Sequence, residues 1–336
     1  MPEKMPENRQ VVIASVPDGP LQVNNFQVQR GEIPTPGEGQ VLCRTLALTI
    51  GAGQRAGLQG SASYAGAAQS GVVMGGSGVA TVEVSNSPSY AVGDLVVGPT
   101  GWQEFSVHDA AALEPVEPGT DPALQLGGLG TNGLTAYFGL LDIGAPQAGE
   151  TVVVSAAAGS VGHIVGQIAK LKGCRVVGVA GSSAKCEMLT GELGFDTAVN
   201  YKDEDFRAAF KAATPDRIDV YFDNTGGDVL GSALFRMNTK GRIVCCGVVS
   251  QYDTANPGPG PRGVPGLLVN NRVRMEGFLV FDYLDRYQEG RRQIRDWVGS
   301  GKLKLRVSEF QGLDAAPQAF VDLLGGATTG TTIVRL

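Results

Sequence analysis

The stretch Thr151–Gly162 has the residue types and the spacing to bind the pyrophosphate of a dinucleotide. Its first five residues, Thr151–Ser155, form an apolar, β-branched run typical of a strand buried on both faces. Ala156, Gly159 and Gly162 follow at regular spacing, and an apolar helical pattern comes directly behind them. Glycines let backbone N–H groups approach phosphate oxygens, and the positive end of the helix dipole favours their charge. The strand and helix context predicts a dinucleotide site here rather than close packing alone.

The next strand indicates which dinucleotide is bound. In an NAD-binding fold an acidic residue about twenty residues beyond the glycines holds the adenine ribose. Here the corresponding turn contains Gly181, Ser182, Ser183 and Lys185, and no carboxylate. Hydroxyls and a lysine suit a 2′-phosphate through hydrogen bonds and charge, although a helix N-cap serine and a solvated lysine are alternatives. The missing acid favours NADPH/NADP+ over NAD(H).

Two regions of the chain, with different secondary-structure patterns, must position these residues. The chain has 336 residues, enough for two domains with separate cores. Up to Pro118 short alternating runs are broken by Gly and Pro, which predicts a β-rich, barrel-like or sandwich-like domain. The strands expected there are Val11–Ser15, Phe26–Arg30, Val41–Leu48, Val79–Val84, Leu95–Gly98 and Glu104–Val107.

Helical and strand patterns alternate after Pro118, which predicts an α/β doubly wound parallel sheet, the Rossmann architecture. We expect helices at Leu124–Gly139, Ala184–Leu193, Phe206–Thr214, Val229–Leu234 and Tyr283–Ser300. The strands expected after Ser155 are Arg175–Ala180, Thr197–Asn200, Ile218–Asp223, Arg242–Gly247 and Val273–Val280. Short strand patterns within Arg306–Leu336 predict that the chain returns to the first domain.

Composition and rare residues restrict the classes of function. The net charge of −6, without a basic block, argues against nucleic acid or an anionic membrane as a partner. Neither a signal peptide nor a membrane-spanning run is found, and five scattered cysteines fit reduced thiols, so we expect a cytoplasmic protein. His108 and His163 are the only histidines, and Cys245 and Cys246 must point to opposite faces of a strand. A catalytic zinc site is therefore not expected, and His163 is expected to pack or to lie at the surface rather than transfer protons.

The chain resembles the zinc-independent medium-chain dehydrogenase/reductases, and within them the NADPH-dependent alkenal, prostaglandin and curcumin double-bond reductases. The resemblance covers nearly the whole sequence. It is carried by GLTAYFGL at 133–140, AAAGSVG…VGQIAKLKGC at 156–174, DNTGG at 223–227, CGVVSQY at 246–252 and EGFLV at 276–280. It implies a GroES-like domain (1–126 and 298–336) around a Rossmann domain (127–297), a homodimer, and an active site in a cleft.

The resemblance also implies a cofactor site. Gly159, Ser160, Val161 and Gly162 would bind the pyrophosphate. Lys185 and Tyr201, beside Gly181 and Ser182, would flank the 2′-phosphate and adenosine. The ribose and nicotinamide would be lined by Asn224, Cys246, Gly247, Val248, Ser250, Phe278, Leu279 and Val280, although Asn224 as a turn cap and Phe278 and Val280 as buried strand residues are alternatives.

In the family, hydride is delivered to the β-carbon of an enone or enal, and the resulting enolate is protonated. That chemistry requires an oriented cofactor and a donor near the developing oxyanion. We expect Tyr252 near that oxygen as the catalytic side chain, with a packed loop aromatic as the alternative. The expected activity is therefore NADPH-dependent reduction of the C=C bond of an α,β-unsaturated carbonyl compound, a small-molecule substrate, without a metal.

The sequence departs from the family where the substrate should lie. Gly53, followed by Arg55, stands where the family commonly has an aromatic residue, and Thr131–Asn132 replaces Met-Pro. Thr328 and Thr331 replace an Asn and a Lys. The polar pair at 131–132 favours a second hypothesis, a carbonyl/alcohol or quinone oxidoreductase on the same fold. The lost aromatic residue supports a third, a non-catalytic NADPH-binding sensor or structural protein.

Overall fold

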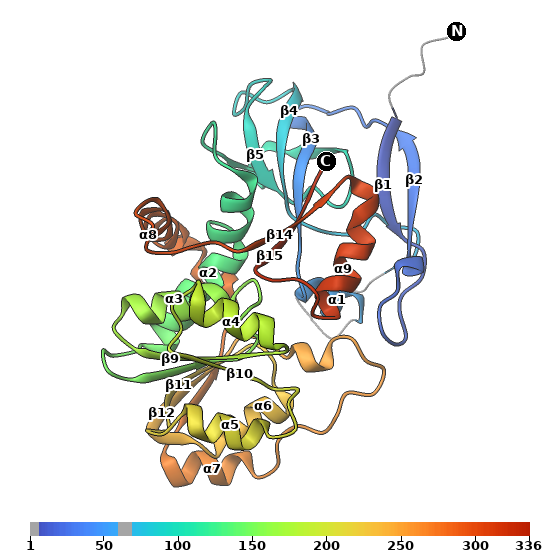
Figure 1. Ribbon diagram of the computed structural model, residues 1–336. Coiled ribbons are helices and arrows are strands. Elements are labelled where there is room, and N and C mark those ends of the chain that lie inside the picture. The colour runs from blue at the N-terminus through green and yellow to red at the C-terminus, as the bar shows by residue number, and fades with distance from the viewer. Residues whose placement is uncertain (1–6, 60–68) are drawn as a thin grey trace. The chain divides into compact units, whose positions relative to one another are not determined.

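The computed structural model describes residues 7–59 and 69–336, which form two compact units. Residues up to Gly127, together with Val307–Leu336, make the first unit, and Gly128–Arg306 makes the second. Both are drawn in Figure 1. No helix in these residues is long and apolar enough to cross a membrane.

The first unit is built on a mainly antiparallel seven-stranded sheet and a two-stranded ribbon. The sheet order is β14-β15-β3-β4-β5-β7, with β6 beside β3. Because β15 pairs antiparallel with β3, the end of the chain belongs to this sheet. The strands are β1 (Glu7–Ile13), β2 (Phe26–Glu32), β3 (Gln40–Ile50), β4 (Gly78–Ser85), β5 (Leu95–Gly98), β6 (Phe105–Asp109), β7 (Glu114–Pro115), β14 (Val307–Gln311) and β15 (Thr331–Arg335).

Helix α9 (Ala316–Leu324) covers part of this sheet, and α1 (Gly53–Leu58) follows β3. Phe320 of α9 packs edge-on against the fully buried Trp102, with their ring centroids 5.7 Å apart. Short 3₁₀ turns lie at Val23–Asn25, Ala110–Ala112 and Leu313–Ala315. The strand-only pattern predicted for the C-terminal stretch was therefore incomplete, because α9 lies between its two strands.

The second unit is a six-stranded, fully parallel sheet in the order β10-β9-β8-β11-β12-β13. This is the strand order of the doubly wound dinucleotide-binding fold, with the order reversing between β8 and β11. The predicted fold class, a Rossmann sheet plus a separate antiparallel β domain, is confirmed. The strands are β8 (Thr151–Val154), β9 (Arg175–Ala180), β10 (Thr197–Asn200), β11 (Ile218–Asp223), β12 (Met237–Cys245) and β13 (Arg274–Gly277).

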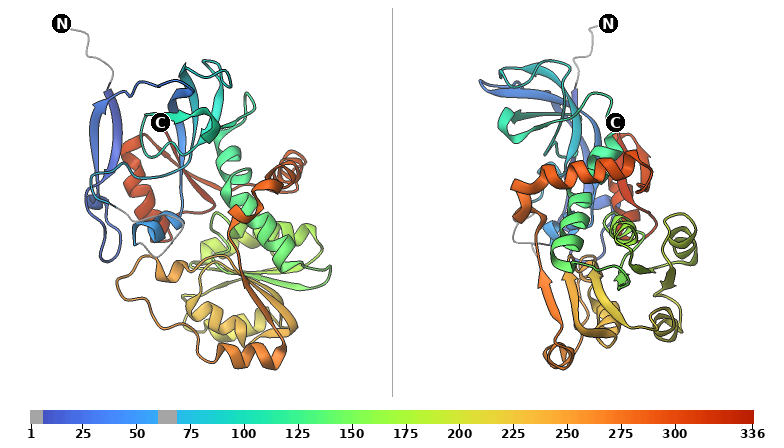
Figure 2. Two further views of the ribbon diagram at one scale, coloured as in Figure 1. Left: turned by 180° about the vertical axis from the view of Figure 1, so that it is seen from behind. Right: turned by 90° about the vertical axis from the view of Figure 1, so that its left-hand side faces the viewer.

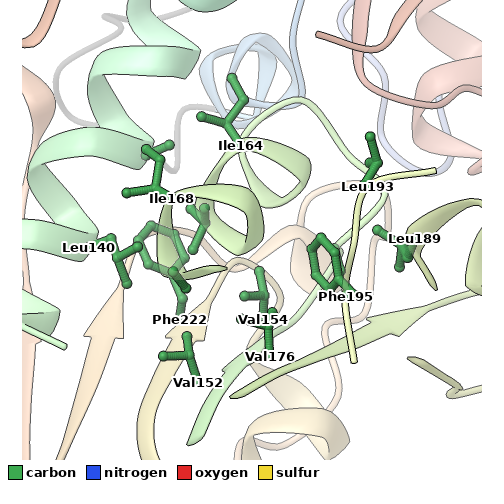
Figure 3. Packing of buried hydrophobic residues seen from close by; sticks show 14 of the residues in the cluster. Leu140, Val152, Val154, Ile164, Ile168, Val176, Leu189, Leu193, Phe195 and Phe222 are labelled. Carbon is green, nitrogen blue, oxygen red and sulfur yellow. The ribbon is translucent and has the colours of Figure 1, made fainter. Parts of the chain in front are cut away.

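Helices cover both faces of the parallel sheet (Figure 1). They are α2 (Thr131–Phe138), α3 (Gly162–Leu171), α4 (Ser183–Gly191), α5 (Phe206–Ala213), α6 (Gly227–Leu234), α7 (Val264–Asn271) and α8 (Tyr287–Gly299). Side chains of α2, α3, α4 and α8 share a core with one face, and those of α5, α6 and α7 share a core with the other. In the first core, Ile164 and Ile168 of α3 lie over Val152, Val154 and Val176 (Figure 3).

Several predicted boundaries were wrong. The helix expected at Leu124–Gly139 is interrupted, because a π-helical turn (Leu124–Gly128) ends before Gly130, whose extended backbone precedes α2. A second π-helical turn (Gly139–Gly144) follows. Strand β12 ends at Cys245, short of Gly247, and a 3₁₀ turn (Val249–Gln251) comes after it. The strand expected to reach Val280 stops at Gly277, and Val280–Arg286 is a 3₁₀ segment before α8.

Candidate functional site

The glycine-rich loop connects β8 to α3. Ala156 takes a left-handed backbone (φ 46°), which turns the chain out of the buried strand. A Cβ on Gly162 would lie 2.4 Å from the Ala156 carbonyl oxygen, so only glycine allows the helix to begin here. Among the described residues no protein acceptor is recorded for the backbone N–H groups of Ser160 and Val161. Free N–H groups at the start of a helix fit a phosphate group.

His163 lies behind this loop, fully buried. Its Nδ1 is 2.8 Å from the Gly159 carbonyl oxygen, and its Nε2 accepts from the backbone N–H of Arg306 at 3.2 Å. This pair of partners requires a neutral ring with the proton on Nδ1. Burial lowers the pKa of His163 to about 4. Of the two positions expected for His163, these contacts agree with packing, and its burial contradicts a surface position.

The turn between β9 and α4 contains the residues predicted to hold the 2′-phosphate. Ser182 is the N-cap of α4, and its hydroxyl oxygen accepts from the backbone N–H of Lys185 at 3.3 Å. The hydroxyl proton of Ser182 is then directed away from the helix. Tyr201, nearly half exposed, lies beside Gly181, because a Cβ on that glycine would be 3.0 Å from its Cε1. Gly181, Ser182 and Tyr201 are therefore neighbours at one edge of the sheet.

Asp223, at the end of β11, joins three segments near the glycine-rich loop. Its carboxylate accepts from Tyr221 Oη at 3.0 Å, from Ser155 Oγ at 3.2 Å and from the Gly226 N–H at 2.9 Å. Burial raises the pKa of the Asp223 carboxyl, and these hydrogen bonds oppose that shift. Asn224 is held in the same network, since its Nδ2 donates to the Ser155 carbonyl at 2.7 Å. The end of β11 is thereby fixed against the end of β8.

The segment after β12 is fixed by the same residues. The Asp223 carbonyl accepts from the N–H groups of Cys246 and Gly247, at 2.9 and 3.1 Å. The Tyr252 hydroxyl oxygen accepts from the Val248 N–H at 3.3 Å, and Ser250 Oγ donates to the Thr225 carbonyl at 2.6 Å. The loop predicted to line the ribose and nicotinamide is therefore held against the end of β11 by these hydrogen bonds. This conformation leaves the Tyr252 hydroxyl proton directed away from Val248.

The residues that follow β13 differ in how far their side chains are exposed. Phe278 is half-buried and packs against the core under Gly139, where a Cβ would lie 2.5 Å from its ring. Val280 is buried, whereas Leu279 is 42% exposed. Val280 could therefore contact a cofactor only through its backbone, and Phe278 through its backbone or the edge of its ring. Their role as cofactor residues stays a prediction.

The residues predicted to form a substrate pocket lie in both units. Gly53 and Arg55 are on α1 of the first unit, where the buried Arg55 guanidinium donates to the Gly19 carbonyl at 2.6 Å. Thr131, exposed, and Asn132, half-buried, occupy the first turn of α2 in the second unit. Their part in substrate binding stays a prediction.

The cysteines near the site have the chemistry of buried thiols. Cys246 packs in the core on one face of the sheet and Cys245 in the core on the other, as the strand pattern predicted. Burial raises the pKa of Cys245 to about 11 and that of Cys246 to about 12, so neither is a thiolate at neutral pH. Across residues 7–59 and 69–336 no three His, Cys, Asp or Glu side chains are grouped to hold a metal ion.

Comparison with known proteins identifies the class. A profile described as the N-terminal domain of oxidoreductase matches residues 9–116, and one described as zinc-binding dehydrogenase matches residues 160–295. With the relatives described next, these matches place the chain in the zinc-independent medium-chain dehydrogenase/reductases, among the double-bond reductases.

Two similar proteins and one similar solved structure support this placement. An NADPH-dependent curcumin reductase of Escherichia coli (strain K12) is 41% identical, over 100% of this chain and 99% of its own. Prostaglandin reductase 1 of Rattus norvegicus is 40% identical, over 93% and 94%. The crystal structure of CurA in complex with NADPH from Vibrio vulnificus has a TM-score of 0.93 and 39% identity, over 97% and 98% of the two chains.

Proposed function

We propose that this protein is an NADPH-dependent reductase of the C=C bond of α,β-unsaturated carbonyl compounds. The observation that carries the proposal is the arrangement of three loops at one end of the parallel sheet, where we place the dinucleotide. There the free N–H groups of Ser160 and Val161 lie on the loop after β8, and the fixed loops after β11 and β12 come from the adjoining strands. Relatives similar over nearly the full chain are named for NADPH-dependent reduction of curcumin and for reduction of prostaglandins and 2-alkenals.

The chemistry that NADPH supplies when bound is the donation of a hydride to the β-carbon of the substrate. The C=C electron pair moves to the carbonyl oxygen, and the enolate then takes a proton at its α-carbon, so the substrate gains two electrons and two hydrogens. The protein must hold the nicotinamide rigidly and stabilise the oxyanion. The hydrogen bonds of Asp223 hold the loops that we expect to contact the nicotinamide. To stabilise the oxyanion we propose Tyr252, whose hydroxyl oxygen is positioned by accepting from the Val248 N–H.

The enone reaction is tested by product analysis. We expect purified protein, NADPH and a panel of enones and enals to give saturated ketones and aldehydes, identified by mass spectrometry and NMR. Deuteride from specifically labelled NADPD should appear at the β-carbon. Allylic alcohols as products, or no turnover across the panel, would contradict the proposal.

Carbonyl or quinone reduction is a second candidate function. It is favoured by the polar side chains of Thr131 and Asn132 in the first turn of α2, where they could bind a substrate oxygen. Product analysis distinguishes the two reactions, because carbonyl reduction places the deuterium on the carbonyl carbon. Thr131→Met/Asn132→Pro, which restores the apolar pair common in the family, should then favour C=C reduction.

We also propose that the protein is a homodimer and acts in the cytoplasm. Strand β13 is an edge strand of the parallel sheet (Figure 2, orange), and no described strand pairs with its outer edge. Apolar side chains are exposed on the elements before and after it: Val269 on α7 is 72% exposed, and Leu284 after β13 is 63% exposed. The five free cysteines suit a reducing compartment.

A further inference from the structure

Strands β9 and β10 bring a second lysine to the turn that contains Lys185. The two strands are paired in parallel with Asn200 opposite Ala180, and the Tyr201 N–H extends the ladder by donating to the Ala180 carbonyl at 2.9 Å. The two strands therefore end side by side at the same edge of the sheet. Tyr201 and Lys202 come out beside Gly181.

The Lys202 side chain lies over the Gly181 backbone. A Cβ on Gly181 would be 3.4 Å from Lys202 Cε and 3.3 Å from Tyr201 Oη. The Lys202 ammonium nitrogen is 5.9 Å from the centre of the Tyr201 ring. The absence of a side chain at 181 thus leaves room for Tyr201 and Lys202 to lie above the turn that leads into α4.

Two positive charges lie near this turn. Burial and, after it, the positive charge of Lys202 both lower the pKa of Lys185. No carboxylate of the described residues forms an ion pair with Lys202. The neighbouring Asp203 carboxylate accepts instead from Asn200 Nδ2 at 2.5 Å. Two like charges near one another repel, and a phosphate bound beside both of them would relieve that repulsion.

We propose that Lys202 is a second cationic ligand of the cofactor 2′-phosphate, acting with Lys185 and the Ser182 hydroxyl. The inference rests on the proposed function for the identity of the cofactor. A phosphate monoester carries a charge of about −1.5 to −2 at neutral pH, which one lysine does not neutralise and two do. Lys202 therefore sets the preference for NADPH over NADH, and Tyr201 supports its alkyl chain beside the adenosine.

The test measures binding rather than turnover. Isothermal titration of the full-length protein with adenosine 2′,5′-bisphosphate and with 5′-AMP separates the 2′-phosphate from the rest of the nucleotide. In Lys202→Gln we expect about a tenfold or larger rise in the Kd for the bisphosphate, with the Kd for 5′-AMP unchanged, because only a charge-assisted contact is lost. The salt dependence of bisphosphate binding should weaken, and Lys202→Arg should restore affinity.

Lys211→Gln is the matched control, since Lys211 is an exposed lysine of the same unit on α5. It should bind both nucleotides as the wild type does. The inference is overturned if Lys202→Gln binds the bisphosphate as well as the wild type, or if it loses 5′-AMP equally. A wild-type protein that does not distinguish the two nucleotides overturns both this inference and the proposed NADPH preference. Failure of enone reduction with the binding result intact would affect the proposed reaction alone.

Discussion

His163 shows how one buried side chain connects the glycine-rich loop to a distant part of the second unit. Its ring bridges the Gly159 carbonyl and the Arg306 N–H, and burial lowers its pKa from an ordinary 6.5 to about 4. Between those two pH values the unfolded chain binds a proton that the folded protein excludes. The free energy of unfolding should therefore fall as the pH drops through this window, by about 1.4 kcal/mol per pH unit and about 3 kcal/mol in all.

Urea unfolding at pH 7, 6 and 5 measures this loss. His163→Asn should be less stable at pH 7, because the ring packing is lost, but its stability should fall less steeply with acidification. His108→Asn is the control: burial also lowers the pKa of His108, but that ring is half-buried and bonded to Ser106 Oγ. Its variant should keep most of the wild-type pH slope. Parallel stability curves for the wild type and His163→Asn would rule out this role for His163.

At the scale of the elements, the join between β8 and α3 depends on Gly162. A Cβ there would lie 2.4 Å from the Ala156 carbonyl oxygen and 2.8 Å from Ala157 Cα, and neither backbone atom can rotate away. Gly162→Ala should therefore cost about 1–3 kcal/mol of unfolding free energy. It should also weaken NADPH binding by more than tenfold, because the loop carrying Ser160 and Val161 must shift.

Gly191→Ala provides the control for that substitution. Gly191 ends α4, has no atom within 4 Å of an added Cβ and has no left-handed backbone. Alanine there should leave NADPH affinity unchanged and raise stability by up to about 1 kcal/mol. Thermal unfolding and NADPH titration of both variants make the comparison. NADPH affinity of Gly162→Ala equal to that of wild type would contradict the requirement for glycine.

The sequence pattern predicted the inner strands of the parallel sheet well because β8, β9 and β11 are buried runs containing β-branched residues. Strands β9, β10 and β11 have the predicted bounds. Strand β12 begins earlier than predicted because its first half is irregular: Lys240 takes a left-handed backbone, and the register with β11 shifts. Helices α7 and α9 were not predicted. Each has proline in its first turn, and α7 also lacks a clear apolar period.

The site was predictable where it follows one continuous stretch of chain and not where strand pairing creates it. Gly159, Gly162 and Lys185 were predicted from local spacing. Lys202, which we propose as a further phosphate ligand, was not predicted because its approach to Gly181 depends on the register of β10 against β9. The Asp223 network was also missed, since a buried carboxylate at a strand end has no local sequence signal that distinguishes it from an exposed one.

At the scale of the whole molecule, the outer edge of β13 would be an aggregation hazard if nothing covered it. Edge strands with flanking apolar side chains pair readily with another chain, and a two-fold axis would bring the same edge of a second copy against it. Val269 lies in the last turn of the helix before this strand, and Leu284 lies on the segment after it. We expect these side chains to be buried in the proposed homodimer.

Val269→Glu together with Leu284→Glu should convert the dimer into a monomer. Four carboxylates would be placed in one two-fold interface, where burial without a partner costs several kcal/mol. Light scattering after gel filtration should give twice the chain mass of 34.9 kDa for wild type and a single chain for the variant. Val92→Glu, at a 67% exposed valine of the first unit, should stay dimeric. A wild type of one chain mass, or a double variant that remains dimeric, would remove this edge as the interface.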